Sequence, residues 1–220
     1  FQHLSPGGAI SYVEVPDMQD NIPAVLEVMK FIYDHIIYAE LNTKSDYCQV
    51  CGWDGEIDIV EEGGKLIWRC PKCGNMIFPR INPSVIVAVT HGDYLLLTKY
   101  ANRPGATRTA LVAGFTEFAE SFEQTVHREV MEEVGLKVKD LRYYRCQPWG
   151  ISGNIMMGYW CRLDGDDDAI HLDNFELADG AWVSREELRE NYTGNGIALT
   201  SEMIAEFAAG RDPYSLEKNK

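Results

Sequence analysis

The sequence has 220 residues, 45% of them hydrophobic and 25% charged, which is enough chain for one or two globular domains. Its net charge of −14 argues against broad nucleic-acid binding, because such binding relies on Lys and Arg to neutralise phosphates. No apolar run approaches the roughly 18–20 residues of a transmembrane helix, and no signal peptide is visible. We therefore expect a cytoplasmic protein without a membrane partner.

The first 45 residues contain an apolar segment, 9–15, which ends at Pro16. A helix is predicted over 22–41, because its apolar residues recur close to the 3.6-residue helical period. No residue type in this segment suggests catalysis. We interpret residues 1–45 as a packing or dimerisation element.

Four of the six cysteines form two C-x-x-C pairs that are separated by 18 residues: Cys48, Cys51, Cys70 and Cys73. Without a secretory signal, this spacing indicates zinc thiolates rather than disulfides. Four thiolates leave no open coordination position, so a structural zinc is expected, with a redox role as the alternative. The two remaining cysteines, Cys146 and Cys161, lie in predicted strands and are interpreted as small core residues.

Residues 46–78 are predicted to form a zinc ribbon, because β-rich runs at 57–60 and 65–69 flank a Glu-Glu-Gly-Gly turn. Residues 2–75 as a whole resemble the C-terminal part of anaerobic ribonucleotide reductases. In that family a glycyl-radical loop follows the ribbon, whereas this sequence continues into a strand without a Cys-Gly-Tyr motif. The resemblance therefore suggests a shared scaffold and not radical chemistry.

From Pro79 onward the pattern predicts short strands at 85–90, 94–99, 109–113, 141–146 and 155–163. His91-Gly92-Asp93 joins the first two strands as a hairpin. Ser184 opens a helix through a capping box with Glu187, and Thr200 or Ser201 caps a last helix that ends near Gly210.

The segment from Gly114 to Leu136 carries the main functional signal. A helix is predicted from Phe122 to Val134, with Gly135 as its C-terminal stop. Its acids recur at i, i+3 and i+4 and so share one face: Glu129, Glu132 and Glu133. Such a face suits a hard divalent cation and a substrate phosphate, with a solvated acidic surface as the alternative reading.

This segment matches G-x5-E-x7-R-E-U-x-E-E-x-G-U, where U is aliphatic, from Gly114 through Glu120 and Arg128 to Leu136. It thereby resembles the Nudix hydrolases, which cleave a nucleoside diphosphate linked to a further group. The resemblance implies an α/β fold, a Nudix α/β/α sandwich, over residues 79–220, preceded by the helical segment and the zinc ribbon. It assigns the catalytic roles to Arg128, Glu129, Glu132 and Glu133.

The segment 147–154, between two predicted strands, narrows the expected substrate. Its Gln-Pro-Trp sequence and the preceding ribbon resemble the NADH pyrophosphatase subfamily, although the usual continuation Pro-Phe-Pro-x-Ser is replaced by Gly-Ile-Ser-Gly-Asn. Trp149 can stack on a base, and nearby polar side chains can bind ribose or phosphate. The expected substrate-binding residues are Phe78, Gln147, Pro148, Trp149, Ser152 and Asn154. Core positions for Phe78 and Trp149 are the alternatives.

The resemblance also implies a site for Mg²⁺ or Mn²⁺, formed by Glu129, Glu133, Glu176 and the backbone carbonyl of Ala113. Cations there would neutralise the pyrophosphate and acidify a water molecule, with Glu132 as a base. The expected reaction splits NAD(H) into AMP and nicotinamide mononucleotide. A surface role for Glu176 stays open.

Alternative substrates are ADP-ribose, other nucleoside diphosphate derivatives or the NAD cap of an RNA, the last being the only nucleic-acid partner expected. A non-catalytic zinc-ribbon module is an alternative of another class. A ligand-sensing regulator would need a DNA-binding helix pair, which the pattern does not indicate. The resemblance further implies a homodimer.

Overall fold

The computed structural model describes residues 2–4, 10–12, 48, 50–54, 58–63, 65–77, 81–100, 109–149, 153–172, 177–194 and 198–218. The chain divides into two compact units, one with residues 1–16, 23–81 and 149–154 and the other with residues 17–22, 82–148 and 155–220. The helix predicted over 22–41 lies outside the described residues. Within the described ranges, no helix combines the length and the apolar character needed to cross a membrane.

The first unit contains short antiparallel strands. β1 (Gln2–Leu4) pairs with β2 (Ile10–Tyr12), and a separate sheet has the order β3 (Asp58–Glu62), β4 (Lys65–Arg69) and β5 (Met76–Ile77). Glu62 pairs with Lys65 at the hairpin end, and Gly63 has a φ of 60°. The hairpin predicted for the ribbon is therefore confirmed.

The second unit is built on a sheet with the order β11, β7, β6, β10 and β9, in which β8 also pairs with β6. In chain order these strands are β6 (Asn82–His91), β7 (Tyr94–Tyr100), β8 (Val112–Phe115), β9 (Val138–Trp149), β10 (Asn154–Leu163) and β11 (Leu177–Ser184). Gly92 has a φ of 62° in the turn between β6 and β7, as its place in the predicted hairpin requires.

Strand β6 shows why helices cover both faces of this sheet. Seven of its ten residues are buried, and their hydrophobic side chains alternate between two clusters. Val85, Val87 and Val89 belong to one cluster, whereas Ile86 and Ala88 belong to the other. Because successive strand residues point to opposite faces, the sheet has two buried faces, and the predicted α/β/α sandwich is confirmed.

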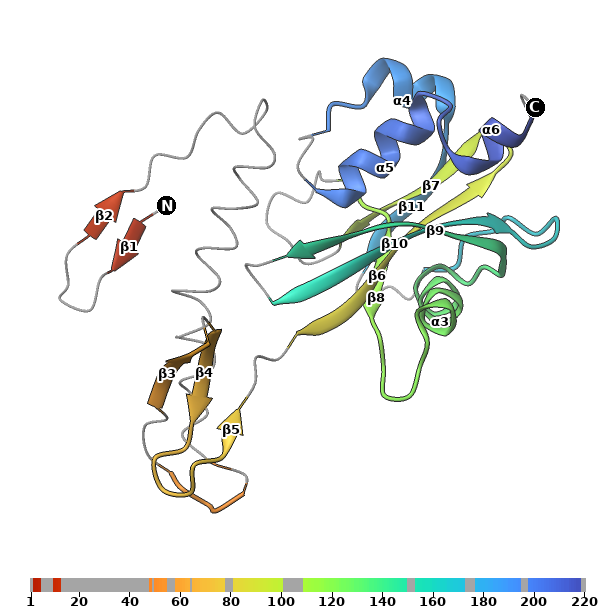
Figure 1. Cartoon of the computed structure of the whole chain (residues 1–220). Helices are drawn as coiled ribbons and strands as arrows, with labels where there is room; N and C mark the ends of the chain where they lie inside the picture. The colour runs from red at the N-terminus through yellow and green to blue at the C-terminus, as the bar shows by residue number, and fades with distance from the viewer. Residues whose placement is uncertain are drawn as a thin grey trace. The chain divides into compact units, whose positions relative to one another are not determined.

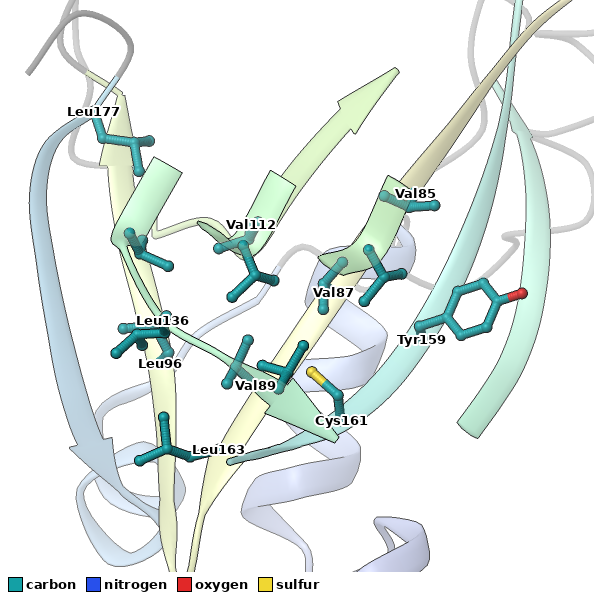
Figure 2. Close-up of a cluster of buried hydrophobic side chains, with 14 residues drawn as sticks. Val85, Val87, Val89, Leu96, Val112, Leu136, Tyr159, Cys161, Leu163 and Leu177 are labelled. Carbon is teal, nitrogen blue, oxygen red and sulfur yellow. The ribbon is translucent and has the colours of Figure 1, made fainter. Parts of the chain in front are cut away.

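One face is covered by α3 (Phe122–Val134), whose Val126, Val130 and Val134 are fully buried. Figure 2 shows the cluster that these valines join, with Val85, Val87 and Val89 of β6 beside Cys161 of β10. Full burial of one such side chain contributes roughly 1.5–3 kcal/mol. Packing against the sheet thus fixes which face of α3 turns inward and which carries the acids.

The other face is covered by α4 (Arg185–Asn191), α5 (Leu199–Ala208) and α6 (Pro213–Lys218), opposite α3 (Figure 1). Ser184 is the predicted cap of α4, and its hydroxyl accepts a hydrogen bond from the Glu187 backbone N–H at 3.1 Å, which is one half of the predicted capping box. The helix predicted to end near Gly210 is α5, and its end is confirmed, but it begins at Leu199 without a cap from Thr200 or Ser201, and α6 follows it. Asp212 starts α6 by accepting from the backbone N–H groups of Tyr214 and Ser215.

Candidate active site

Helix α3 carries the acidic residues of the candidate site and has the predicted bounds. Ser121 and Gln124 form a capping box, since each side chain accepts a hydrogen bond from the other residue's backbone N–H, at 3.3 and 2.8 Å. Gly135 ends the helix in the left-handed conformation, with a φ of 70°. The capping box and the terminal glycine therefore determine where this helix begins and ends.

The three acids of the predicted face differ in their exposure. Glu129 and Glu133 are buried, at 9% and 4% exposure, whereas the Glu132 side chain is 60% exposed. Burying a carboxylate costs free energy unless it is paired, hydrogen-bonded or bound to a metal. Two buried carboxylates one helical turn apart therefore form a local concentration of negative charge that a cation would stabilise.

Strand β8 runs against the Glu129 side chain, and this close approach explains the glycine at position 114. A Cβ atom built on Gly114 would lie 1.9 Å from Cδ of Glu129 and about as close to both of its carboxylate oxygens. Any larger residue would displace the carboxylate. Ala113, the candidate carbonyl ligand, directly precedes this contact on β8.

Arg128 uses all five of its N–H donors within the protein. Nε and Nη2 bind the two oxygens of Glu120 at 2.7 and 2.9 Å. The other Nη2 donor binds the carbonyl of Phe115 at 2.8 Å, and Nη1 binds Glu129 at 2.8 Å and Glu132 at 3.0 Å. Of these contacts, the one with Glu132 is the i, i+4 pair that helical spacing favours. This geometry supports a positioning role for Arg128, because no donor remains for a substrate phosphate.

Glu120 should govern part of the acid stability of the protein. Its hydrogen bonds with Arg128 lower its pKa from 4.5 to about 2. Because the pKa is lower in the folded state, ionised Glu120 stabilises the fold above pH 4.5, and this contribution is lost as the pH falls toward 2. Glu120→Gln is therefore expected to flatten the loss of stability between these pH values, measured by urea unfolding at each pH. The exposed Glu190→Gln is the matched control, and identical pH curves for Glu120→Gln and the wild type would contradict the assignment.

The Gln-Pro-Trp segment extends strand β9 instead of forming a loop. β9 ends at Trp149, and β10 begins at Asn154. Gln147 is buried, and its Oε1 accepts the backbone N–H of Leu199 at 2.8 Å. It therefore caps the first turn of α5, where Ala198 has no side-chain oxygen to do so. This contact supports a positioning role for Gln147, which the sequence alone assigned to substrate binding.

The structure describes only some of the other residues that the sequence singled out. Phe78, Ser152 and Glu176 lie outside the described residues. Cys161 is buried as predicted, and burial raises the pKa of its thiol, but the prediction for Cys146 was wrong because it is exposed on β9. Sequence reasoning also missed the Phe115 carbonyl and the anchoring role of Glu120. Only the fixed spacing of Glu120 from Gly114 pointed to the latter.

A second candidate site lies in the first unit. The sulfur atoms of Cys48, Cys51, Cys70 and Cys73 all lie within 4.8 Å of one another. Each pair ends in a matching turn, in which the N–H of Gly52 or Gly74 binds the carbonyl of Cys48 or Cys70 at 2.8 Å. The backbone hydrogen bond of Cys51 lowers the pKa of Cys48 to about 6, whereas the pKa of Cys73, which contacts the other three thiols, is raised to about 12, because four thiols in one cluster resist gathering four negative charges without a metal.

Comparisons with known proteins agree with this arrangement. Residues 1–82 match the family described as anaerobic ribonucleoside-triphosphate reductase. A protein of Photobacterium profundum called NAD-capped RNA hydrolase NudC is 38% identical over 148 residues, which cover 67% of this chain and 53% of that protein. A protein of the same description from Pasteurella multocida is 36% identical over 136 residues, covering 62% and 50%. The chain thus spans about half the length of the curated relatives it matches.

The fold is shared with a solved structure. The crystal structure of a NUDIX hydrolase from Nitrosomonas europaea superposes with a TM-score of 0.60 at 22% identity, and covers 75% of this chain and 91% of its own. Residues 80–202, more than half of the chain, match the NUDIX domain family. They include β8, α3 and the described residues that form hydrogen bonds with Arg128. The chain therefore belongs to the Nudix family.

Proposed function

We propose that this protein hydrolyses the pyrophosphate bond of NAD(H) or a closely related dinucleotide and releases AMP and nicotinamide mononucleotide. The observation that carries the proposal is the pair of buried carboxylates, Glu129 and Glu133, on the helix that packs against Gly114. The relatives named NAD-capped RNA hydrolase and the Gln-Pro-Trp segment at the end of β9 narrow the substrate to an NAD-like dinucleotide.

The proposed roles follow from the chemistry of each side chain. Glu129, Glu133 and the Ala113 carbonyl offer the hard oxygen ligands that Mg²⁺ or Mn²⁺ prefers, with Glu176 as a further ligand. A divalent cation bound there would neutralise charge on the pyrophosphate and lower the pKa of an attacking water. Glu132, the exposed acid, accepts the proton, while Arg128 keeps Glu129 and Glu132 in place.

The base and ribose of the substrate are the proposed partners of Trp149 and Asn154, with Phe78 and Ser152 completing this set. Trp149 offers a flat apolar face, and Asn154 and Ser152 offer hydrogen-bonding groups. Pro148 restricts the backbone between Gln147 and Trp149.

The described charges favour a free dinucleotide over the NAD cap of an RNA. On β9 and β10, the cations form ion pairs between 2.6 and 3.3 Å with acids: Lys139 with Asp164, Arg142 with Glu217, Arg145 with Glu202, and Arg162 with Asp140. A Lys or Arg that is already paired with an acid neutralises nucleic-acid phosphates poorly, so it releases few of the counterions bound to the nucleic acid. With a net charge of −14, the protein therefore offers little attraction for an RNA backbone along these strands.

The experiment that tests this function is a substrate panel with Mg²⁺ or Mn²⁺. NADH, NAD⁺, ADP-ribose and an NAD-capped RNA oligonucleotide are incubated with the protein, and the products are resolved by chromatography. We expect cation-dependent release of AMP from NADH or NAD⁺, with slower decapping of the RNA. If every compound stayed intact with either cation, the non-catalytic zinc-ribbon module would be the better reading.

We further propose that residues 1–45 form a packing segment, residues 46–78 a ribbon with one structural zinc, and residues 79–220 the Nudix domain of a cytoplasmic homodimer.

A tetrahedral zinc with Zn–S bonds of about 2.3 Å places its sulfurs about 3.8 Å apart. The Cys48–Cys73 and Cys51–Cys70 sulfurs are each 3.7 Å apart, so the four-cysteine site fits this ion.

The zinc assignment predicts a loss of metal from Cys70→Ser. The variant is expected to fall from about one zinc per chain to nearly none by elemental analysis, because serine is a poor ligand for zinc. The packing around the buried Trp68, next to Cys48 and Cys70, should loosen and change the near-UV circular dichroism. Cys146→Ser, at an exposed cysteine outside the cluster, is the control and should keep its zinc. A full zinc content in Cys70→Ser would remove that residue from the site.

A further inference from the structure

Phe118 lies on the connection between β8 and α3, which projects away from the sheet (Figure 1). Its side chain is fully exposed, at 102%. Single exposed apolar residues are common and need no explanation by themselves. Here, however, the neighbouring backbone is strained, and the strain is maintained by specific contacts.

Ala119, the next residue, has a φ of +67°. This left-handed conformation is unfavourable for a residue with a Cβ atom, and glycine is the usual choice. It persists here because Glu120 closes the turn from both sides. The Glu120 N–H donates to the Glu117 carbonyl at 3.2 Å, and the Glu117 N–H donates to the Glu120 carboxylate at 3.0 Å. Phe118 and Ala119 are thus the two central residues of a fixed turn.

This turn is anchored at the acidic site through Glu120 and through Phe115, two residues before Glu117. The Glu120 carboxylate accepts two hydrogen bonds from Arg128 and a third from the Thr125 hydroxyl at 3.0 Å. On the other side, the Phe115 carbonyl accepts from Arg128 at 2.8 Å. Arg128 in turn holds Glu129. Phe118 is two residues from Glu120 in the sequence, which limits the separation of their Cα atoms to about 7 Å. Because Glu120 is fixed by Arg128, Phe118 is held at the margin of the acidic face.

The turn has the properties of a platform for a flat, uncharged ring. Strain at a fixed turn is typical of binding sites, where it keeps a side chain in the conformation that a ligand requires. The acids around the turn, Glu117, Glu120 and Glu132, disfavour an anionic partner but not a neutral ring. Phe115 on β8 and Met131 on α3 are also exposed by more than 40%.

We propose that Phe118 determines substrate specificity by stacking on a base of the dinucleotide, adenine or nicotinamide, whose pyrophosphate lies at Glu129 and Glu133. This inference rests on the proposed function and adds a base-binding residue that its motifs do not contain. Stacking of a base on an aromatic side chain corresponds to about a 5- to 150-fold change in affinity.

The test compares Phe118→Ala and Phe118→Trp with the wild type, using NADH and Mg²⁺. We expect Phe118→Ala to raise KM about tenfold, within the range given above, and to change kcat less than twofold, because the ring contacts the base and not the reacting atoms. Phe118→Trp should keep the wild-type KM. Tyr94→Ala removes a less exposed aromatic ring, at 47%, from the β6–β7 hairpin and should change neither constant.

Two outcomes would overturn the inference. One is an unchanged KM in Phe118→Ala, and the other is conversion of a dimer to a monomer in sedimentation, which would assign the ring to a contact with a second copy. Titration of NADH into Glu133→Gln, with and without Phe118→Ala, separates this inference from the proposed reaction. If the wild type binds NADH without cleaving it, and Phe118→Ala weakens that binding, only the proposed reaction fails.

Discussion

Glu133→Gln is expected to lower kcat for NADH by about 10²–10³-fold, the range found when one preorganised electrostatic contact is removed from an active site. Glutamine keeps the shape of the side chain and removes its charge, so the buried pair with Glu129 loses an anionic ligand that a divalent cation needs. The same change relieves repulsion between two buried carboxylates. The melting temperature without added divalent cation should therefore stay equal or rise.

The measurement combines steady-state kinetics over a range of Mg²⁺ concentrations with thermal unfolding. Added Mg²⁺ should raise the melting temperature of the wild type more than that of Glu133→Gln, because ligand binding stabilises the folded state. Glu123→Gln is the control on the same helix, where the acid accepts a hydrogen bond from the Tyr159 hydroxyl at 3.0 Å. A kcat of Glu133→Gln within twofold of the wild type would exclude Glu133 from the reaction.

Gly114→Ala is expected to abolish most activity while leaving the protein folded. The added Cβ would overlap the carboxylate of Glu129, whose Cδ lies 1.9 Å from the built position. This carboxylate is the end of a flexible side chain, so it can rotate away at the cost of its 2.8 Å hydrogen bond with Arg128. Misplacing a catalytic group by about 1 Å can cost about 10²-fold in rate, and we expect kcat to fall by at least that factor.

Thermal unfolding and kinetics together distinguish this effect from a loss of structure. A destabilisation of about 1 kcal/mol would lower the melting temperature by only about 2–4 °C in a domain of this size. Gly92→Ala is the matched control, because its Cβ would meet no atom within 4 Å and only the φ of +62° is strained. It should lose comparable stability and keep its activity. Full activity of Gly114→Ala would show that the position of Glu129 is not critical.

Local sequence signals predicted those parts of the fold that depend on neighbouring residues. The end of α3 was predicted from its terminal glycine, a signal that acts within a few residues, and the structure adds the Ser121 cap at its start. The two C-x-x-C turns, the β6–β7 hairpin and the Ser184 cap are local in the same sense. The start of α5 was predicted wrongly because its cap comes from Gln147, 52 residues earlier in the chain.

By itself, the sequence determined that an acidic helix would follow a glycine at the end of a strand and that four cysteines would form one cluster. Only the tertiary structure decided which acids are buried, because exposure depends on what packs against α3. The tertiary structure likewise decided that all five N–H groups of Arg128 form hydrogen bonds within the protein, with Glu120, Phe115, Glu129 and Glu132. It also decided that Gln147 caps the first turn of α5. The contacts of Arg128 with Glu120 and Phe115, and of Gln147 with Leu199, join residues from separate parts of the chain, so no local periodicity predicts them.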